Sequence, residues 1–138
     1  MLNAAENRPL ITQRILFPGI LYNRFMHEFT ITKAILSIVV QKAQEIQAGK
    51  IKKIDLQVGK LTGYLPGSIQ LQFAILSKDT VAEDASLTFH QPPANLHCRK
   101  CNVDFTTDSL DLACPDCHTL ETDILSGLEL SVESMEIE

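Results

Sequence analysis

The sequence predicts an α+β fold, in which two helices cover a small mixed sheet and a short cysteine-containing ribbon is inserted before the last strand. Three observations support this class. One long stretch repeats apolar residues at the helical period, several short stretches alternate apolar and polar residues, and two cysteine pairs lie near the C-terminal end. We predict three parts: an N-terminal extension (1–25), an α+β domain (26–95 with 123–138) and a cysteine module (96–122).

Composition and charge exclude some classes of protein. Hydrophobic residues make up 45% of the chain and charged residues 21%, which is typical of a globular domain. The longest apolar run is too short to cross a bilayer, so we predict no membrane association. A net charge of −5 disfavours binding to the backbone of a nucleic acid. No secretory signal is visible, and we therefore predict a cytoplasmic protein.

The first 25 residues differ from the rest of the chain. Their apolar stretch, Ile15 to Leu21, is interrupted by Pro18-Gly19, which is a turn signal. No small-residue cleavage site follows it, as a signal peptide would require. We interpret residues 1–25 as a flexible or loosely docked extension, and we favour a translation start at Met26.

The first helix is predicted from Phe29 to Ile46. Its apolar residues recur near the 3.6-residue period and share one face: Ile31, Ala34, Ile35, Ile38, Ala43 and Ile46. Gly49 follows, and glycine is favoured just after a helix C-terminus. The apolar face therefore predicts core packing for this helix.

A strand and a second helix follow the first helix. Residues 54–58 alternate apolar and polar side chains, which predicts a strand with one solvated face. A loop is expected over 59–67. Pro66 suits the first turn of a helix, which we predict over residues 66–78.

Two further strands are predicted on either side of the cysteine pairs. Residues 87–90 alternate apolar and polar side chains and form one strand, on which His90 faces solvent. Two prolines then end this strand. The last strand places three apolar residues on one face: Leu128, Leu130 and Val132. The apolar phase then slips by one residue, which predicts a β-bulge near Glu133-Ser134. We expect this strand to return to the sheet of the α+β domain.

The four cysteines of the chain form the pattern C-x2-C-x12-C-x2-C. They are Cys98, Cys101, Cys114 and Cys117. A two-residue gap lets one tight turn aim two thiolates at a single point, and two such turns supply a tetrahedron of sulfurs for Zn²⁺. With no coordination position left open, the zinc is structural. Residues 96–122 are therefore predicted to be a zinc-ribbon domain.

Other interpretations of the cysteines are weaker. A rubredoxin-like iron site would use the same four ligands and is the main alternative metal. Disulfides or redox pairs are disfavoured in a reducing cytosol. The C-x-x-C-H pattern from Cys114 to His118 resembles a haem attachment site, but haem attachment requires export. His97 and His118 flank the pairs, and we interpret both as surface residues because four cysteines already complete the coordination.

The remaining candidate site is Met26-His27-Glu28, which we place just before the first helix. A lone histidine at such a position is most often an exposed polar residue. If the chain began at Met26, however, a terminal amine, backbone amides and an imidazole would lie within one chelate. Nitrogen donors in a plane suit a square-planar ion such as Ni²⁺ or the competing Cu²⁺.

These features together resemble a known family. The ordered set is Met26-His27-Glu28, the long amphipathic helix, Val58-Gly59, Thr80-Val81-Ala82-Glu83 with Leu87, the two cysteine pairs, and the closing strand from Leu128 to Glu138. Over residues 26–138, the chain resembles the HypA/HybF family of hydrogenase nickel-incorporation proteins. No single motif is decisive, but the ordered set with these spacings is specific.

The resemblance implies a nickel metallochaperone that is not itself an enzyme. Such proteins deliver Ni²⁺ to the [NiFe]-hydrogenase large subunit together with a HypB-type GTPase, and in some bacteria they also serve urease maturation. A homodimer is compatible with this family. By match to the family motif, the resemblance implies that His27 is the nickel ligand, assisted by the Met26 amine and by the Glu28 amide or side chain. It makes 26–95 with 123–138 the nickel-binding domain.

Two positions depart from the family pattern. Relatives usually begin at the Met-His-Glu methionine, whereas 25 residues precede it here, so the Met26 nitrogen would be an amide. Relatives often carry an acidic residue just before the second helix, where this chain has Leu65. The alternative function is a zinc-ribbon module that binds protein or nucleic acid without nickel. A redox protein is a third and weaker alternative.

Overall fold

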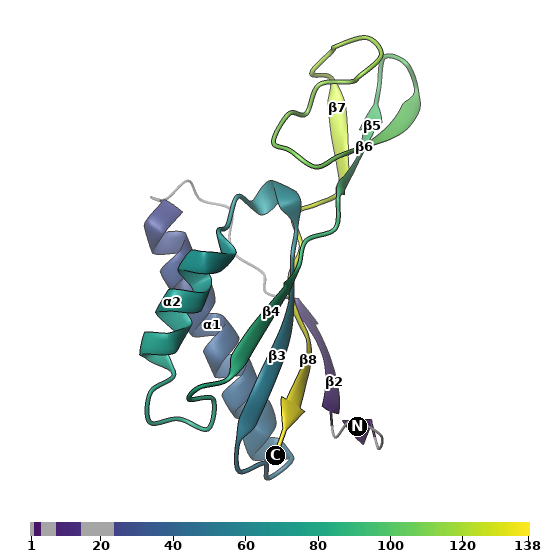
Figure 1. Ribbon diagram of the computed structural model, residues 1–138. Helices are drawn as coiled ribbons and strands as arrows, with labels where there is room; N and C mark the ends of the chain where they lie inside the picture. The colour runs from purple at the N-terminus through teal and green to yellow at the C-terminus, as the bar shows by residue number, and fades with distance from the viewer. Residues whose placement is uncertain (1, 4–7, 15–23) are drawn as a thin grey trace.

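The computed structural model describes residues 2–3, 8–14 and 24–138, and their side chains from Glu28 onward. It confirms the predicted α+β class. Figure 1 shows a larger sheet with both helices on one face and a smaller sheet extending from one end of it. Neither described helix has the length and apolarity that a bilayer crossing requires.

The larger sheet has the strand order β1-β2-β8-β3-β4. Its strands are β1 (Leu2–Asn3), β2 (Arg8–Arg14), β3 (Ile51–Val58), β4 (Ser86–His90) and β8 (Leu130–Ile137). The pair β3 and β4 is parallel, and the other neighbours are antiparallel. A parallel pair needs a crossover connection, which the helix between these strands supplies. Because β8 pairs with β3, the predicted return of the last strand to this sheet is confirmed.

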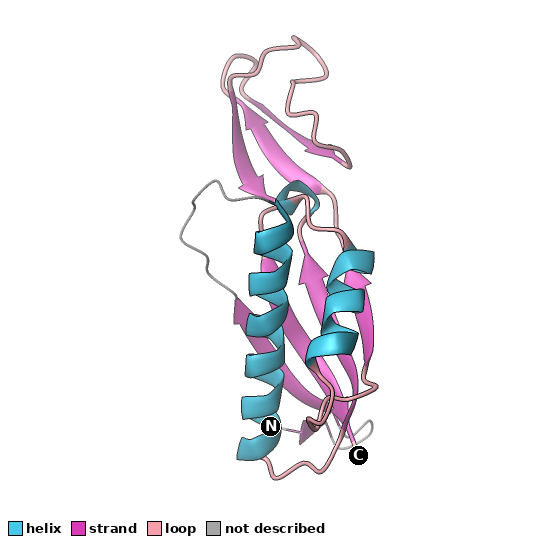
Figure 2. Cartoon of the chain, turned by 90° about the vertical axis from the view of Figure 1, so that its left-hand side faces the viewer, coloured by secondary structure: helices cyan, strands magenta, loops and turns pink. Residues whose placement is uncertain are grey.

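Two helices cover the sheet, as Figure 2 shows from the side. Helix α1 (Arg24–Glu45) begins five residues before the predicted start at Phe29. Helix α2 (Pro66–Leu76) begins at the predicted proline, whose missing N–H costs nothing in a first turn. The loop before it contains a short 3-10 helix, η1 (Lys60–Thr62).

The hydrophobic core fills the layer between the helices and the larger sheet. Its buried side chains come from α1, α2, β3, β8 and the loops beside them: Ile31, Ile35, Val39, Ala43, Ile51, Ile54, Leu56, Val58, Ile69, Phe73, Ala82, Leu130, Val132, Met135 and Ile137. Most of the predicted helix face lies in or against this core, with Ile38 and Ile46 partly buried. Val39 completes the buried face of α1.

The predicted bulge in the last strand is confirmed. Asp55 of β3 lies opposite Ser134, and the next residue, Leu56, lies opposite Val132. Glu133 is therefore the extra residue, as the slip of apolar phase predicted. The prediction that Leu128 shares the buried face was wrong, because it lies before the strand and is 59% exposed. His90 is exposed, as predicted.

The N-terminal extension contains two strands that the sequence analysis missed, β1 and β2, which pair with each other. Residues 8–14 form β2 and pair with β8, with Leu10 opposite Ser134 and Arg14 opposite Ser131. The prediction of a flexible or loosely docked extension was therefore wrong for this segment. For residues 1, 4–7 and 15–23, the prediction lies outside the described residues.

The smaller sheet has the order β6-β5-β7 and is inserted between β4 and β8. Its strands are β5 (Ala94–Cys98), β6 (Val103–Thr107) and β7 (Thr122–Ser126). Gly59 and Gly127 meet where the two sheets join: a Cβ on Gly59 would lie 2.1 Å from the Gly127 carbonyl oxygen. Gly127 also has a φ of +131°, which side chains rarely adopt. Both glycines are thus required for this close approach.

Candidate metal centres

The first cysteine pair lies on the turn between β5 and β6. Cys98 ends β5, and the backbone N–H of Cys101 donates to its Sγ at 3.2 Å. The chain then reverses through Asn102, whose N–H donates to the Cys98 carbonyl at 2.8 Å and whose φ is +56°. Asparagine tolerates this left-handed conformation better than most residues. The turn thus brings two thiols to one side.

The second pair repeats the same turn. His118, four residues after Cys114, donates its N–H to the Cys114 carbonyl at 2.8 Å and has a φ of +61°. It therefore corresponds to Asn102 of the first turn, and its backbone conformation closes the knuckle. The exposed His118 ring is not among the clustered ligand atoms. This agrees with its interpretation as a surface residue.

The two turns bring four sulfur atoms together. The Sγ atoms of Cys98, Cys101, Cys114 and Cys117 all lie within 4.8 Å of one another. Those of Cys98 and Cys117 are 3.7 Å apart, and none of the four cysteines is in a disulfide. A tetrahedral zinc with Zn–S bonds of about 2.3 Å separates its sulfurs by about 3.8 Å. The donor set and its spacing therefore fit a divalent ion with four thiolate ligands.

Crowding of the sulfurs has an electrostatic consequence. The pKa of the Cys101 thiol is raised to about 12, chiefly by its hydrogen bond with Cys117 and further by Cys98. The negative charge of a thiolate beside other sulfurs is not compensated unless a cation is present. Bound metal supplies this positive charge and favours the deprotonated form.

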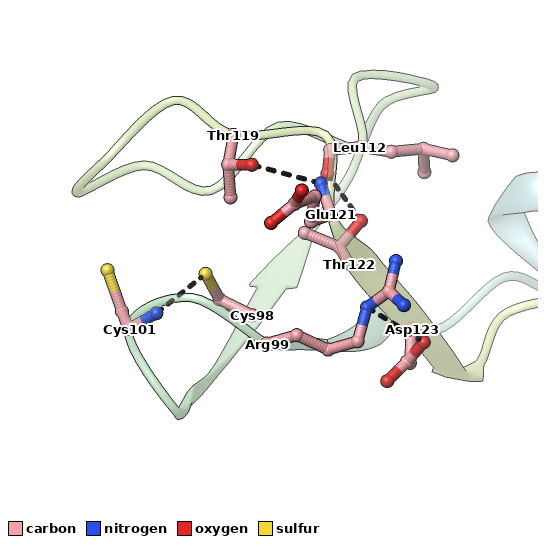
Figure 3. Close-up of polar contacts among 8 residues, drawn as sticks. All are labelled: Cys98, Arg99, Cys101, Leu112, Thr119, Glu121, Thr122 and Asp123. Carbon is pink, nitrogen blue, oxygen red and sulfur yellow. Dashed lines mark hydrogen bonds and ion pairs between the residues drawn. The ribbon is translucent and has the colours of Figure 1, made fainter.

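Polar contacts brace the cluster from the strand side, as Figure 3 shows. The Arg99 N–H donates to the Glu121 carbonyl at 3.1 Å, and the Arg99 side chain lies 3.6 Å from Asp123. The Thr122 hydroxyl donates to the Leu112 carbonyl at 2.9 Å. These contacts connect the first turn to β7 and to the loop before the second turn.

His97 precedes the first cysteine on β5, and its side chain contacts Asp104. Its Nδ1 lies 2.5 Å from Asp104 Oδ1 on the paired strand β6. Successive side chains of a strand point to opposite faces, so His97 faces away from the Cys98 sulfur. It is not among the clustered ligand atoms of the described residues.

The structure places Met26-His27-Glu28 within the first turns of α1, whereas we predicted them before the helix. The side chains of Met26 and His27 lie outside the described ones. Glu28 is buried, at 4% exposure, and its Oε2 accepts a hydrogen bond from the Leu65 N–H at 2.9 Å. Leu65 is the N-cap residue of α2, so the Glu28 carboxylate connects the start of one helix to the start of the other.

The pKa of Tyr64 depends on the charge of Glu28. Burial raises the pKa of Tyr64, and the nearby Glu28 carboxylate raises it further. The side chain of Leu65, the position at which the sequence analysis noted a departure from the family pattern, is 56% exposed. The carboxylate that contacts the start of α2 thus belongs to Glu28 of α1. The residues are 37 positions apart, and no local pattern could have predicted their contact.

Both helix starts lie at the end of the larger sheet that carries the cysteine module (Figure 1). The four-sulfur cluster is on the far turns of that module, whereas Met26-His27-Glu28 lies on α1. The two candidate centres are therefore built on different parts of the chain, and the described ligand atoms of one do not contribute to the other.

Comparisons with known proteins identify a family that matches most of the chain. The family model described as hydrogenase/urease nickel incorporation, metallochaperone, hypA matches residues 26–137. A hydrogenase maturation factor HypA from Dehalococcoides mccartyi is 38% identical over 113 residues, which cover 82% of this chain and 95% of that protein. The HypA of Aquifex aeolicus is 31% identical over 113 residues, covering 98% of its own length.

Two solved structures share the fold. The solution structure of the Ni metallochaperone HypA from Helicobacter pylori has a TM-score of 0.57 and 23% identity, covering 80% of this chain and 96% of that one. A second solution structure, of a HypA protein, has a TM-score of 0.61 and 24% identity, covering 82% and 97%. At these identities, the two structures support the fold alone.

Proposed function

This chain belongs to the HypA family of hydrogenase/urease nickel-incorporation metallochaperones, and on that premise we propose that it carries Ni²⁺ to a maturing [NiFe]-hydrogenase. The observation that carries the proposal is the extent of the family match, which begins at Met26 and so opens on Met-His-Glu. In this proposal the protein works in the cytoplasm with a HypB-type GTPase. It performs no catalytic step of its own, and the acceptor is the hydrogenase large subunit or a urease.

The four cysteines are proposed to hold a structural zinc ion. Four thiolates leave no open coordination position, so the ion supplies folding free energy and no chemistry. Iron would accept the same ligands. Elemental analysis of protein purified without added metal tests the choice: one zinc per chain supports it, and one iron with a thiolate-to-iron absorption band contradicts it.

Helix geometry supports a nickel site that starts at Met26. An α-helix pairs each N–H with the carbonyl four residues earlier, and its first N–H groups have no partner. In a helix that begins at Arg24, the carbonyl four residues before the Glu28 amide is that of Arg24, which precedes Met26. A chain starting at Met26 would lack that acceptor. Its amine and the next two amides would then be available to a metal.

The Glu28 contribution is assigned to its backbone amide. Its carboxylate is buried and accepts a hydrogen bond from Leu65. Using the carboxylate as a ligand would leave the Leu65 N–H without its acceptor. The proposed chelate therefore consists of the Met26 nitrogen, the amides of His27 and Glu28, and the His27 imidazole.

The experiment compares nickel affinity in three proteins by calorimetry: the full chain, a chain starting at Met26, and that shorter chain with His27→Ala. We expect the shorter chain to bind Ni²⁺ more tightly, and His27→Ala to abolish the gain while zinc content stays unchanged. Zinc content serves as the control for folding of the cysteine module. Equal nickel affinity in the full and shortened chains would contradict the proposed ligand set.

A second candidate function is a zinc-ribbon module that binds a protein without carrying nickel. It is favoured by exposed apolar side chains on the strands of the smaller sheet: Val103, Ile124 and Leu125. If nickel binding proves absent in all three proteins while Ile124→Ser weakens capture of a hydrogenase maturation protein, this second function replaces the first. Binding to nucleic acid is disfavoured by the net charge of −5.

A further inference from the structure

Strand β2 covers an edge that belongs to the shared part of the family. The family model matches residues 26–137, so β8 lies inside the match and β2 lies outside it. In the sheet order, β8 has β3 on one side and β2 on the other. Without β2, the outer side of β8 would be an unpaired edge. Figure 1 shows β2 beside β8 at the side of the sheet away from β4.

The ladder between β2 and β8 has fewer paired residues than the ladder between β3 and β8. On its inner side, β8 is paired with β3 from Leu130, opposite Val58, to Ile137, opposite Ile51. On its outer side, β2 pairs through Leu10, Gln13 and Arg14, with a shift of register between Leu10 and Gln13. A shorter ladder opens at lower free energy than a long one. Strand β2 is therefore the more easily released neighbour of β8.

Charge distinguishes the strands that can occupy this edge. Strand β8 carries Glu133 and Glu136 and no basic residue, and no lysine or arginine occurs from residue 119 to the C-terminus. Strand β2 carries Arg8 and Arg14 and no acidic residue. On the inner side, Lys53 of β3 lies opposite Glu136. An acidic strand thus has a basic strand on each side.

A second β8 would be a poor neighbour for this edge. Like charges on adjacent strands destabilise their pairing, whereas opposite charges stabilise it. Unpaired edges otherwise tend to recruit an identical edge from another molecule. The acidic composition of β8 disfavours that self-pairing and favours a basic extended segment.

We propose that the outer edge of β8 is a docking site for a basic extended strand, filled in cis by β2, and that a basic segment of a partner protein takes the same place when β2 is released. The partner segment adds one antiparallel strand to the sheet, as in other cases of strand addition. Its affinity should fall as salt is raised, because salt screens the attraction between opposite charges. The inference stands on strand pairing and charge, and it does not depend on nickel binding.

The test measures amide hydrogen exchange on the full chain. In the unmodified protein, the amides of residues 8–14 and the outward-facing amides of β8 should be protected. In the Arg8→Glu, Arg14→Glu variant, exchange at both should be faster by about fivefold or more, because two basic residues of β2 are replaced by acidic ones beside an acidic strand. The control is Lys78→Glu, an exposed lysine after α2, which should leave both rates unchanged.

A peptide tests docking from another molecule. An excess of a peptide with the sequence of residues 7–15, added to the full-length variant, should restore protection of β8, and a peptide with both arginines replaced by glutamate should not. Restoration should weaken as salt is raised.

Three results would overturn the inference. They are unprotected β2 amides in the unmodified protein, equal rescue by both peptides, and a variant that dimerises through β8 regardless of salt. Unchanged nickel affinity across these variants would leave the inference intact, so its failure is distinguishable from failure of the nickel proposal.

Discussion

The two sheets of this protein are stabilised by different means. The larger sheet packs against two helices through a continuous core of buried aliphatic side chains and Phe73. In the smaller sheet, the buried hydrophobic residues are few: Ala94, Leu96, Cys98 and Cys114. Two of these four are metal-ligand candidates. We therefore expect the smaller sheet to depend on the proposed metal ion for its stability, whereas the larger sheet depends on packing.

The comparison also bears on the proposal that one small chain holds two metals in different ways. A cluster of four thiolates binds its ion tightly and is part of the fold. The proposed nickel ligands lie near the start of α1, on a domain that has its own continuous hydrophobic core. Metal can leave such a site without unfolding the domain.

The largest expected effect comes from breaking the sulfur cluster. Cys98→Ser replaces a buried thiol and should abolish stoichiometric zinc binding, since structural zinc contributes about 10–16 kcal/mol of apparent binding free energy in small zinc domains. Hydrogen exchange should show loss of protection over residues 94–126, with the larger sheet still protected. A variant that keeps one zinc per chain and an ordered small sheet would refute the dependence on metal.

A core substitution should produce the opposite pattern. Phe73 is 2% exposed, and Phe73→Ala should destabilise the α+β domain by about 3–5 kcal/mol through lost burial and a cavity. Urea unfolding followed by circular dichroism measures this change, and zinc content should remain at one per chain. The matched control is Leu71→Ala on the same helix, where the side chain is 66% exposed and the cost should stay within about 0.5 kcal/mol. Equal effects of the two would contradict the assigned core.

The smallest effect concerns the contact between the helix starts. Glu28→Gln keeps an oxygen acceptor for the Leu65 N–H but removes the charge beside Tyr64. The pKa of Tyr64 should fall, yet remain above 10.0, because burial is the larger cause of its elevation. Ultraviolet titration in a Tyr22→Phe background measures it, with Glu45→Gln on the exposed end of α1 as the control. An unchanged pKa in Glu28→Gln would exclude the proximity of the two groups.

Because the pKa of Tyr64 is raised in the folded state, the free energy of unfolding should decrease at alkaline pH. The folded state keeps the phenolic proton to higher pH than the unfolded state does. The associated stabilisation is therefore complete below about pH 10 and is lost as pH rises through the folded-state pKa. Glu28→Gln should move this loss to lower pH.

Much of the fold was predictable because its signals are local. The apolar period of α1, the proline that opens α2 and the alternation in β3 each involve residues within a few positions. The bulge at Glu133 was predictable for the same reason, since a slip of phase occurs within one strand. The helix start was not, because Arg24 and Phe25 precede the apolar repeat that defined the predicted helix.

The sequence by itself determined the four-cysteine centre, because two-residue spacings create each pair of ligands locally and the repeated turn needs no distant partner. Only the tertiary structure decided that β2 joins the sheet beside β8, and that the Glu28 carboxylate meets the start of α2. These contacts join residues far apart in the chain. Their formation depends on how the helices pack and on which strand edge remains open, and neither condition is encoded within a short segment.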